Sequence, residues 1–192
     1  MSDIARAAGL QQSSLYYWFR RKELILQATF ALNRVPLEFI NRIGARSGSP
    51  ALKLFRLIRF DTLQLCLSPC DLNEIEGMAE QHPEVFSDFW TDRQRLHDWV
   101  VTLVNVGIEE GQFVECDTEL MAISLLSFDD GIQKRFRFRD QHSPGSASAF
   151  THRQYEASEI AEFVAATSLR ALLRRPGDLA RIQRQAATYQ DA

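Results

Sequence analysis

Apolar residues recur at every third and fourth position almost throughout this chain of 192 residues, and no long segment alternates with a period of two. Such spacing places apolar side chains along one face of a helix, so we expect an all-α fold. The clearest internal boundary is the Gly- and Ser-rich stretch "GARSGSP" at residues 44–50. It predicts a small N-terminal domain with a connecting helix, residues 1–45, and a larger helical domain, residues 46–192.

Turn residues and caps divide this pattern further. A helix that starts near Arg21 should be kinked or broken at Pro36, Asp117 can cap a later helix, and Gly111 should stop the helix before it. The polar stretch 139–153 predicts a loop. The predicted helices outside the Arg21 segment span residues 2–8, 12–19, 51–67, 72–81, 83–110, 117–138, 156–175 and 178–190.

Composition excludes several classes of protein. The chain is 45% hydrophobic and 24% charged, which favours a folded domain. No run reaches the roughly 18–20 apolar residues that a membrane helix needs, so we expect no membrane partner and a cytoplasmic location. The three cysteines do not indicate a disulfide framework, and Cys66 and Cys70 lack the partners of a zinc site. We therefore predict neither a metal nor a cofactor.

Charge is distributed unevenly along the chain. The net charge is −3, yet residues 1–34 contain five basic and two acidic side chains, a net charge of +3. A basic module joined to an acidic body is the pattern expected when the module faces a polyanion such as DNA. The residues counted are Arg6, Arg20, Arg21, Lys22 and Arg34 against Asp3 and Glu23.

The first 24 residues have the pattern of a helix-turn-helix, in which a short second helix enters the major groove of DNA. Gly9 suits a turn that requires positive φ. Ile4, Ala5 and Ala8 are spaced to face inward from the first helix, and Leu10, Leu15 and Phe19 would anchor the second.

The polar face of the second helix would then point outward. Glutamine can bond adenine, serine and tyrosine hydroxyls can bond bases or phosphates, and a lysine at a helix start attracts phosphate. Trp18 shares this face. The predicted DNA-binding residues are Gln11, Gln12, Ser13, Ser14, Tyr16, Tyr17 and Lys22. A protein interface is the other interpretation of such an exposed aromatic helix.

The segment "DIARAAGLQQSSLYYWFRRKELIL" resembles the DNA-binding signature of the TetR family of bacterial transcriptional regulators. "GIEEGQF" at 107–113 and "DDGIQ" at 129–133 are similar to segments of that family's C-terminal domain. Ser13 and Trp18 depart from the family pattern, where a Gly-like residue and often a histidine stand. The ten positions that match are Asp3, Ile4, Ala5, Ala8, Gly9, Leu15, Tyr16, Phe19, Lys22 and Leu24.

The resemblance also implies a further helix in front of the motif, and this chain has none. We expect the chain to be part of a longer protein; the alternative is a variant that binds DNA poorly. At about 25 cal/mol per Å², even 150 Å² of uncovered apolar surface costs on the order of 4 kcal/mol, comparable to the stability of a small domain.

The resemblance to the TetR family implies that the C-terminal helical domain binds a small effector and forms a homodimer. Thirteen phenylalanines and three tryptophans as a set suggest an aromatic-walled pocket for an apolar or aromatic effector, although each residue taken alone is more often ordinary core. The pocket candidates are Phe60, Met78, Phe86, Trp90, Trp99, Leu103, Leu125, Phe128 and Phe163. Asp129 and Asp130 are adjacent, so on a helix their side chains diverge by about 100°, and we expect caps or ion pairs rather than a convergent pair.

Two apolar stripes predict the dimer interface, unless they are core of the same chain. The candidates are Leu120, Ile123, Ile160, Phe163, Val164, Thr167 and Ala171. HExxH, GxSxG, GxxxxGK[ST] and GxGxxG motifs are absent, so we do not expect an enzyme. We predict a DNA-binding repressor that an effector releases from double-stranded operator DNA. The alternative is a helical ligand-binding dimer with little or no DNA binding.

Overall fold

The computed structural model describes residues 1–25, 34–68, 72–138 and 155–189. Within these ranges every regular element is a helix, apart from one isolated antiparallel bridge between Phe113 and Leu173. The prediction of an all-α fold is therefore confirmed. The polar stretch 139–153 lies outside the described residues.

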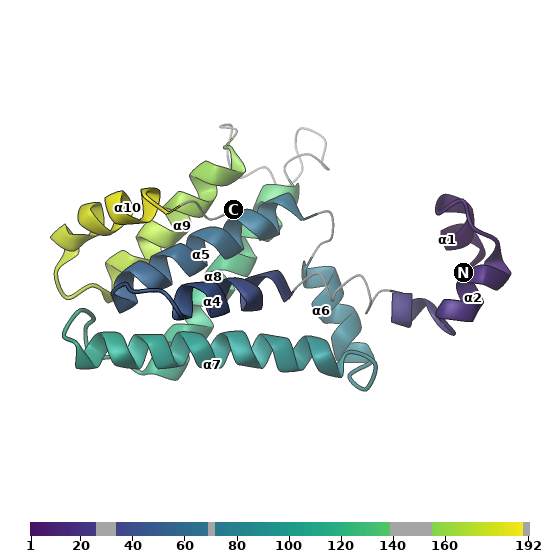
Figure 1. The fold of residues 1–192 in the computed structure, drawn as a ribbon, viewed down its shortest axis with the longest axis horizontal. Helices are drawn as coiled ribbons and strands as arrows, with labels where there is room; N and C mark the ends of the chain where they lie inside the picture. Colours follow the sequence, from purple (N-terminus) through teal and green to yellow (C-terminus); the bar gives the residue numbers. More distant parts are fainter. Residues whose placement is uncertain (26–33, 69–71, 139–154, 190–192) are drawn as a thin grey trace.

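Two short helices stand apart from a larger helical body. Figure 1 shows α1 and α2 at one end of the longest axis, with α4 to α10 grouped toward the other end. Residues 22–25 are helical too. The helices are α1 (Ser2–Ala7), α2 (Gln12–Trp18), α4 (Val35–Gly44), α5 (Pro50–Leu67), α6 (Leu72–Gln81), α7 (Ser87–Glu109), α8 (Thr118–Phe138), α9 (Ala157–Leu172) and α10 (Leu179–Ala187), with the 3-10 turn η2 (Pro176–Asp178) before α10.

Helix α5 is the centre of the body, and α4, α7, α8, α9 and α10 all pack against it. Ser49 caps its start, because its hydroxyl oxygen accepts a hydrogen bond from the Leu52 N–H at 3.2 Å. Pro50 follows in the first turn, where a missing N–H is tolerated. Leu54, Phe55 and Leu57 are fully buried. Helix α5 is buried on most of its sides, and its buried residues include the polar side chains Arg56, Asp61 and Thr62.

Helix α4 belongs to this body. Phe39, Ile40 and Ile43 are part of the main core, and the ring of Phe39 stacks on that of Phe60 with their centroids 4.0 Å apart. Pro36 lies in the first turn of the helix. The boundary that we predicted between residues 45 and 46 therefore falls within the packed body, because α4 and α5 bury their apolar faces together.

Helix α7 differs from its prediction at one end. We expected it to begin at Pro83, but residues 83–86 form a turn in which the Val85 and Phe86 N–H groups both bond the His82 carbonyl oxygen. The other end is confirmed, because Gly111 has a φ of 71° and ends the helix as predicted. Asp117 caps α8 through a 3.0 Å bond from the Leu120 N–H to its carboxylate.

A second, smaller apolar cluster lies where α6 meets the start of α7. Three partly buried residues pack against this cluster: Leu24 from the N-terminal segment, Leu65 from α5 and Trp90 from α7. Leu24 follows the helix-turn-helix, so this cluster links the N-terminal helices to the body. Its buried members are Leu72, Ile75, Ala79, Val85, Phe86 and Phe89.

Candidate DNA interface and ligand-binding region

Helices α1 and α2 form the predicted helix-turn-helix. Gly9 adopts a φ of 66° in the turn between them, as the sequence required. The Leu10 N–H donates to the Ala5 carbonyl oxygen at 2.9 Å and closes the end of α1. Ala5 and Leu15 are the buried residues, one from each helix. The local geometry of the motif therefore follows from small residues at the contact and glycine at the turn.

The other apolar residues of the motif are less covered than their spacing predicts. Ile4, Ala8 and Leu10 are exposed, Leu10 at 53% of its surface, and Phe19 is only half-buried. Two short helices can cover little more than the line along which they touch. In the described structure this line contains Ala5 and Leu15.

All of the predicted DNA-contacting residues are exposed. They extend over α2 and into the helical turn at residues 22–25, which Lys22 begins. Tyr17 and Trp18 both lie on the outer surface. Their rings contact each other edge to face, with the centroids 5.1 Å apart. The exposed set is Gln11, Gln12, Ser13, Ser14, Tyr16, Tyr17 and Lys22.

The predicted dimer stripes are partly exposed. Leu120 and Ile123 on α8 are 61% and 50% exposed, and Phe163 on α9 is 59% exposed. Ala171 is exposed as well, whereas Ile160 and Thr167 are half-buried. The assignment of Val164 to the dimer interface is wrong, because this residue is fully buried in the core of its own chain. Neighbouring positions on a helix point about 100° apart, so Phe163 and Val164 cannot share a face.

The pocket candidates divide between two apolar clusters. Phe60, Leu103 and Leu125 are buried in the main core, and Trp99 and Phe128 are packed against it. Phe86 is buried in the smaller cluster, with Trp90 at its rim and half-buried Met78 on the neighbouring helix α6. Phe163 lies on the outer surface, so its assignment to a pocket within one chain is wrong.

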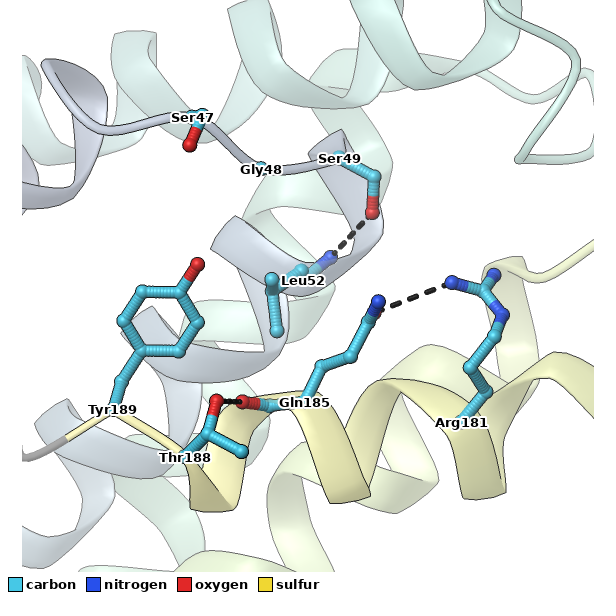
Figure 2. Close-up of a pocket in the computed structure, with 8 residues that line it drawn as sticks. All are labelled: Ser47, Gly48, Ser49, Leu52, Arg181, Gln185, Thr188 and Tyr189. Atoms are coloured by element: carbon cyan, nitrogen blue, oxygen red, sulfur yellow. Dashed lines mark hydrogen bonds between the residues drawn. The ribbon is translucent and has the colours of Figure 1, made fainter.

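A polar hollow lies between residues 47–49 and α10. Its volume is about 330 Å³, and Figure 2 shows the side chains around it. Its polar groups bond one another: the Arg181 guanidinium donates to the Gln185 side-chain oxygen at 3.2 Å, and the Thr188 hydroxyl donates to the Gln185 carbonyl oxygen at 2.7 Å. They do not converge on a common point, so the hollow lacks the features of a specific ligand site.

A cluster of carboxyl groups lies where α5, α6, α7 and α8 come together. Asp61 on α5 is 6% exposed and Asp129 on α8 is 2% exposed, and the two side chains share a hydrogen bond. On α7, the Arg93 guanidinium contacts Asp130 at 2.8 Å and Glu76 of α6 at 2.7 Å. Asp130 forms an ion pair, as expected, whereas Asp129 is, among the described residues, neither a cap nor an ion-pair partner but is buried beside Asp61 in the same cluster.

Burial dominates the protonation of this cluster. It raises the pKa of Asp61 to about 7, with the charge of Asp130 adding to the shift and Arg93 opposing it. Burial and the neighbouring charge of Asp61 likewise raise the pKa of Asp129 well above its ordinary value. Desolvation also raises the pKa of Glu76, while Arg93 counteracts this shift. A hydrogen bond between two carboxyl groups requires a proton, so this pair holds one.

Sequence reasoning missed Asp61 and Arg93. A signal for Asp61 was present, since it is the one acidic residue in the predicted helix at residues 51–67, which is rich in apolar residues, and a buried charge is unexpected there. Arg93 gave no such signal among the charged residues of α7.

Metal binding and membrane insertion each require a particular set of residues in the described part of the chain. It contains no group of three or more His, Cys, Asp and Glu residues arranged to hold a metal ion. Its helices also include none with the length and apolar character needed to cross a membrane.

The described chain thus consists of an exposed helix-turn-helix joined to a larger helical body. Neither a protein-family model nor a curated protein sequence matches this chain. Solved structures that share this fold include TetR-type transcription regulators, so the predicted resemblance is confirmed for the fold. Their sequence identities to this chain are below 25%.

Three of these structures cover most of the chain. A TetR transcription regulator from Haloarcula marismortui is 24% identical with a TM-score of 0.61, over 89% of this chain and 85% of the other. The ketosteroid transcriptional regulator KstR2 of Mycobacterium tuberculosis is 21% identical with a TM-score of 0.60, over 91% and 84%. AmtR of Mycobacterium smegmatis is 20% identical with a TM-score of 0.61, over 98% and 84%.

Proposed function

We propose that this protein is a DNA-binding transcription regulator, and specifically a repressor that a small effector with an apolar or aromatic body releases from its operator. The observation that carries the proposal is the exposed polar face of α2 in a helix-turn-helix, on a fold shared with transcription regulators. Gln11, Gln12, Ser13 and Ser14 lie in the first part of the proposed recognition helix or just before it. This is the part of a recognition helix that reaches base edges in the major groove.

The proposed active form is a homodimer. Two recognition helices must lie about 34 Å apart to enter successive major grooves of a palindromic operator. The exposed apolar residues Leu120, Ile123 and Phe163, with Ile160, Thr167 and Ala171 beside them, supply a surface for the second copy. Burying this surface is favourable in proportion to its apolar area.

The effector would act by preferring one spacing of the two recognition helices. It can weaken DNA binding only by the difference between its binding free energies for the two spacings. Leu24 packs on the small cluster between α6 and α7, so a shift of α6 can move the N-terminal helices. The two aromatic-lined clusters described above are the proposed location of the ligand.

Selection of bound sequences from random duplex DNA tests the proposal. We expect enrichment of an inverted repeat whose half-sites lie one helical turn apart, and an affinity that falls steeply with salt because phosphate contacts release counterions. The measurement is fluorescence anisotropy of the selected duplex at several salt concentrations. Binding without sequence enrichment, or no binding, would support the ligand-binding dimer instead, an outcome in keeping with the uncovered Ile4 and Leu10.

A further inference from the structure

The carboxyl cluster has more negative than positive charge. Arg93 is the cation that acts on Asp61, Glu76 and Asp130 among the described residues, and its guanidinium already contacts two carboxylates. Asp61 therefore has no oppositely charged group of its own. Buried carboxylates are usually paired with a cation or kept neutral by a proton.

One atom of the cluster also lacks a hydrogen-bond partner. Oδ1 of Asp129 is buried and unpaired within the described part of the chain. Thr62, which is fully buried beside it, donates its hydroxyl proton to the Ile58 carbonyl oxygen at 2.8 Å. That hydroxyl proton is therefore not available to Oδ1 of Asp129. An acceptor that is buried without a donor is expensive, and such atoms mark places where a ligand can supply the missing bond.

Apolar and aromatic residues adjoin the charged groups. Asp61 precedes Leu65 by one turn of α5, and Arg93 follows Trp90 by one turn of α7. Residues one turn apart share a helix face, so the cluster borders the small apolar cluster at which Leu65 and Trp90 lie. A ligand that satisfied both parts would have a positive group and an apolar body.

We propose that Asp61, Asp129 and Asp130 bind the ammonium group of an organic cation whose aromatic body lies against the small apolar cluster near Leu65 and Trp90. The ammonium group has N–H donors for Oδ1 of Asp129 and a charge that balances Asp61. This cation is the effector, a role that rests on the function proposed above. An inorganic metal ion fits less well, because the described residues offer no set of ligands arranged for one.

Cation binding should release a proton. The carboxyl groups of Asp61 and Asp129 share one in the free protein, and a cation placed beside them favours the ionised form of both. The proton passes to the buffer, and the ammonium charge takes its place. The groups that face the pair are Thr62, Asp130 and Arg93, and Arg93 is held by Asp130 and Glu76.

The same site offers a route to the DNA-binding motif. A cation beside Asp130 competes with Arg93 for that carboxylate, which weakens the link from α8 through Arg93 to Glu76 on α6. Helix α6 provides part of the surface on which Leu24 packs. Binding at the cluster can therefore alter the position of the segment that follows the recognition helix.

Calorimetric titration of the whole chain at pH 7, without DNA, tests the site. The probes are ω-phenylalkylammonium ions with two to six methylene groups, each compared with the neutral alcohol of the same length. We expect at least one ammonium ion to bind at least tenfold more tightly than its alcohol. Repeating the titration in phosphate and in Tris, which differ in their heats of ionisation, should show net proton release. Binding of no ammonium ion, equal binding of ion and alcohol, or no proton release would overturn the site.

Three variants complete the test. Asp129→Asn and Asp61→Asn are each expected to weaken ammonium binding at least tenfold. Both variants should fold, because an amide replaces a carboxyl group of the same shape, and thermal unfolding checks this. Asp88→Asn removes a carboxylate from an exposed position on α7 and should leave the affinity unchanged. Unchanged binding in both cluster variants would refute the assignment.

DNA binding is measured separately. The ammonium ion should weaken binding to the selected duplex for the original chain, but at least tenfold less effectively for Asp129→Asn. A chain that binds the ion but never binds DNA would contradict the regulator function and leave the cation site standing. Equal DNA binding with and without bound ion would overturn the effector role.

Discussion

The ring of Phe113 occupies the space that a side chain at Gly107 would need. A Cβ atom at Gly107 would overlap ring atoms of Phe113, and the Phe113 N–H donates to the Gly107 carbonyl oxygen at 3.0 Å. Both residues are buried where α7 ends and the chain turns toward α8. The segment "GIEEGQF" therefore fixes this junction by close packing as well as by the positive φ of Gly111.

We expect Gly107→Ala to lower the free energy of unfolding by about 1–2 kcal/mol. Overpacking of a core costs about 1–3 kcal/mol, which exceeds the gain of about 0.5–1 kcal/mol from replacing glycine by alanine in a helix. Gly77→Ala is the matched control, because a Cβ atom there meets nothing within 4 Å, and it should raise stability. Denaturant unfolding measures both variants. Equal changes of the same sign would contradict the packing.

Stability should depend on pH through Asp61 and Asp129. Their pKa values are raised in the folded state, to about 7 for Asp61, so the folded chain binds protons more tightly than the unfolded chain. The resulting stabilisation is fully present below about pH 4 and is lost as pH rises through 7, by up to about 1.4 kcal/mol per pH unit for each group.

The double variant Asp61→Asn, Asp129→Asn lacks the pH-dependent stabilisation that these two carboxyl groups provide. Relative to it, the original chain should become less stable between pH 5 and pH 8, and the difference is measured by urea unfolding at each pH. Parallel pH profiles for the two proteins would show that the carboxyl groups are ionised in the folded state.

DNA affinity should depend on Tyr16 and Lys22 in a sequence-independent manner. Both are exposed on the proposed DNA side, and loss of the Lys22 charge should weaken binding to all duplexes and reduce the salt slope by about 1. Tyr16→Phe should weaken binding more modestly, by the net worth of one hydrogen bond, about 0.5–1.5 kcal/mol. Lys53→Ala, on α5, is the control for charge. Unchanged affinity in both Tyr16→Phe and Lys22→Ala would refute the assignment of α2.

Sequence preference should depend on Gln12. Its exposed amide can form paired hydrogen bonds with adenine, worth about 1–3 kcal/mol of discrimination against another base. We expect Gln12→Ala to relax the preference at one position of each half-site while preserving the salt slope. Repeated selection from random duplexes measures this change, and an identical selected sequence would exclude a base contact by Gln12.

The exposed apolar residues of α8 and α9 should hold the dimer together. Leu120→Glu with Phe163→Glu places two charges on that surface, and we expect the mass in solution to fall toward the 22.0 kDa of one chain. Leu67→Glu changes an equally exposed leucine at the end of α5 and should leave the assembly intact. Sedimentation velocity measures the mass. A monomeric original chain would contradict the proposed interface.

Local features of the structure were predictable from the sequence. Gly9 and Gly111 adopt positive φ, Asp117 caps α8, and the main helices run close to their predicted limits, because turns, caps and apolar periodicity involve residues near one another in the chain. The start of α7 was not predictable from the sequence, since the turn before it depends on burying Val85 and Phe86 against another helix.

The sequence by itself determined an all-helical chain with a helix-turn-helix at its start, because the period of apolar residues and the spacing of that motif are local properties. Only the tertiary structure decided that Val164 faces inward while Phe163 faces outward, and that Asp61, Arg93 and Asp129 meet between four helices. A helical pattern shows that one face is buried but does not identify the residues that bury it. Those partners are distant in the chain, and the packing of the helices selects them.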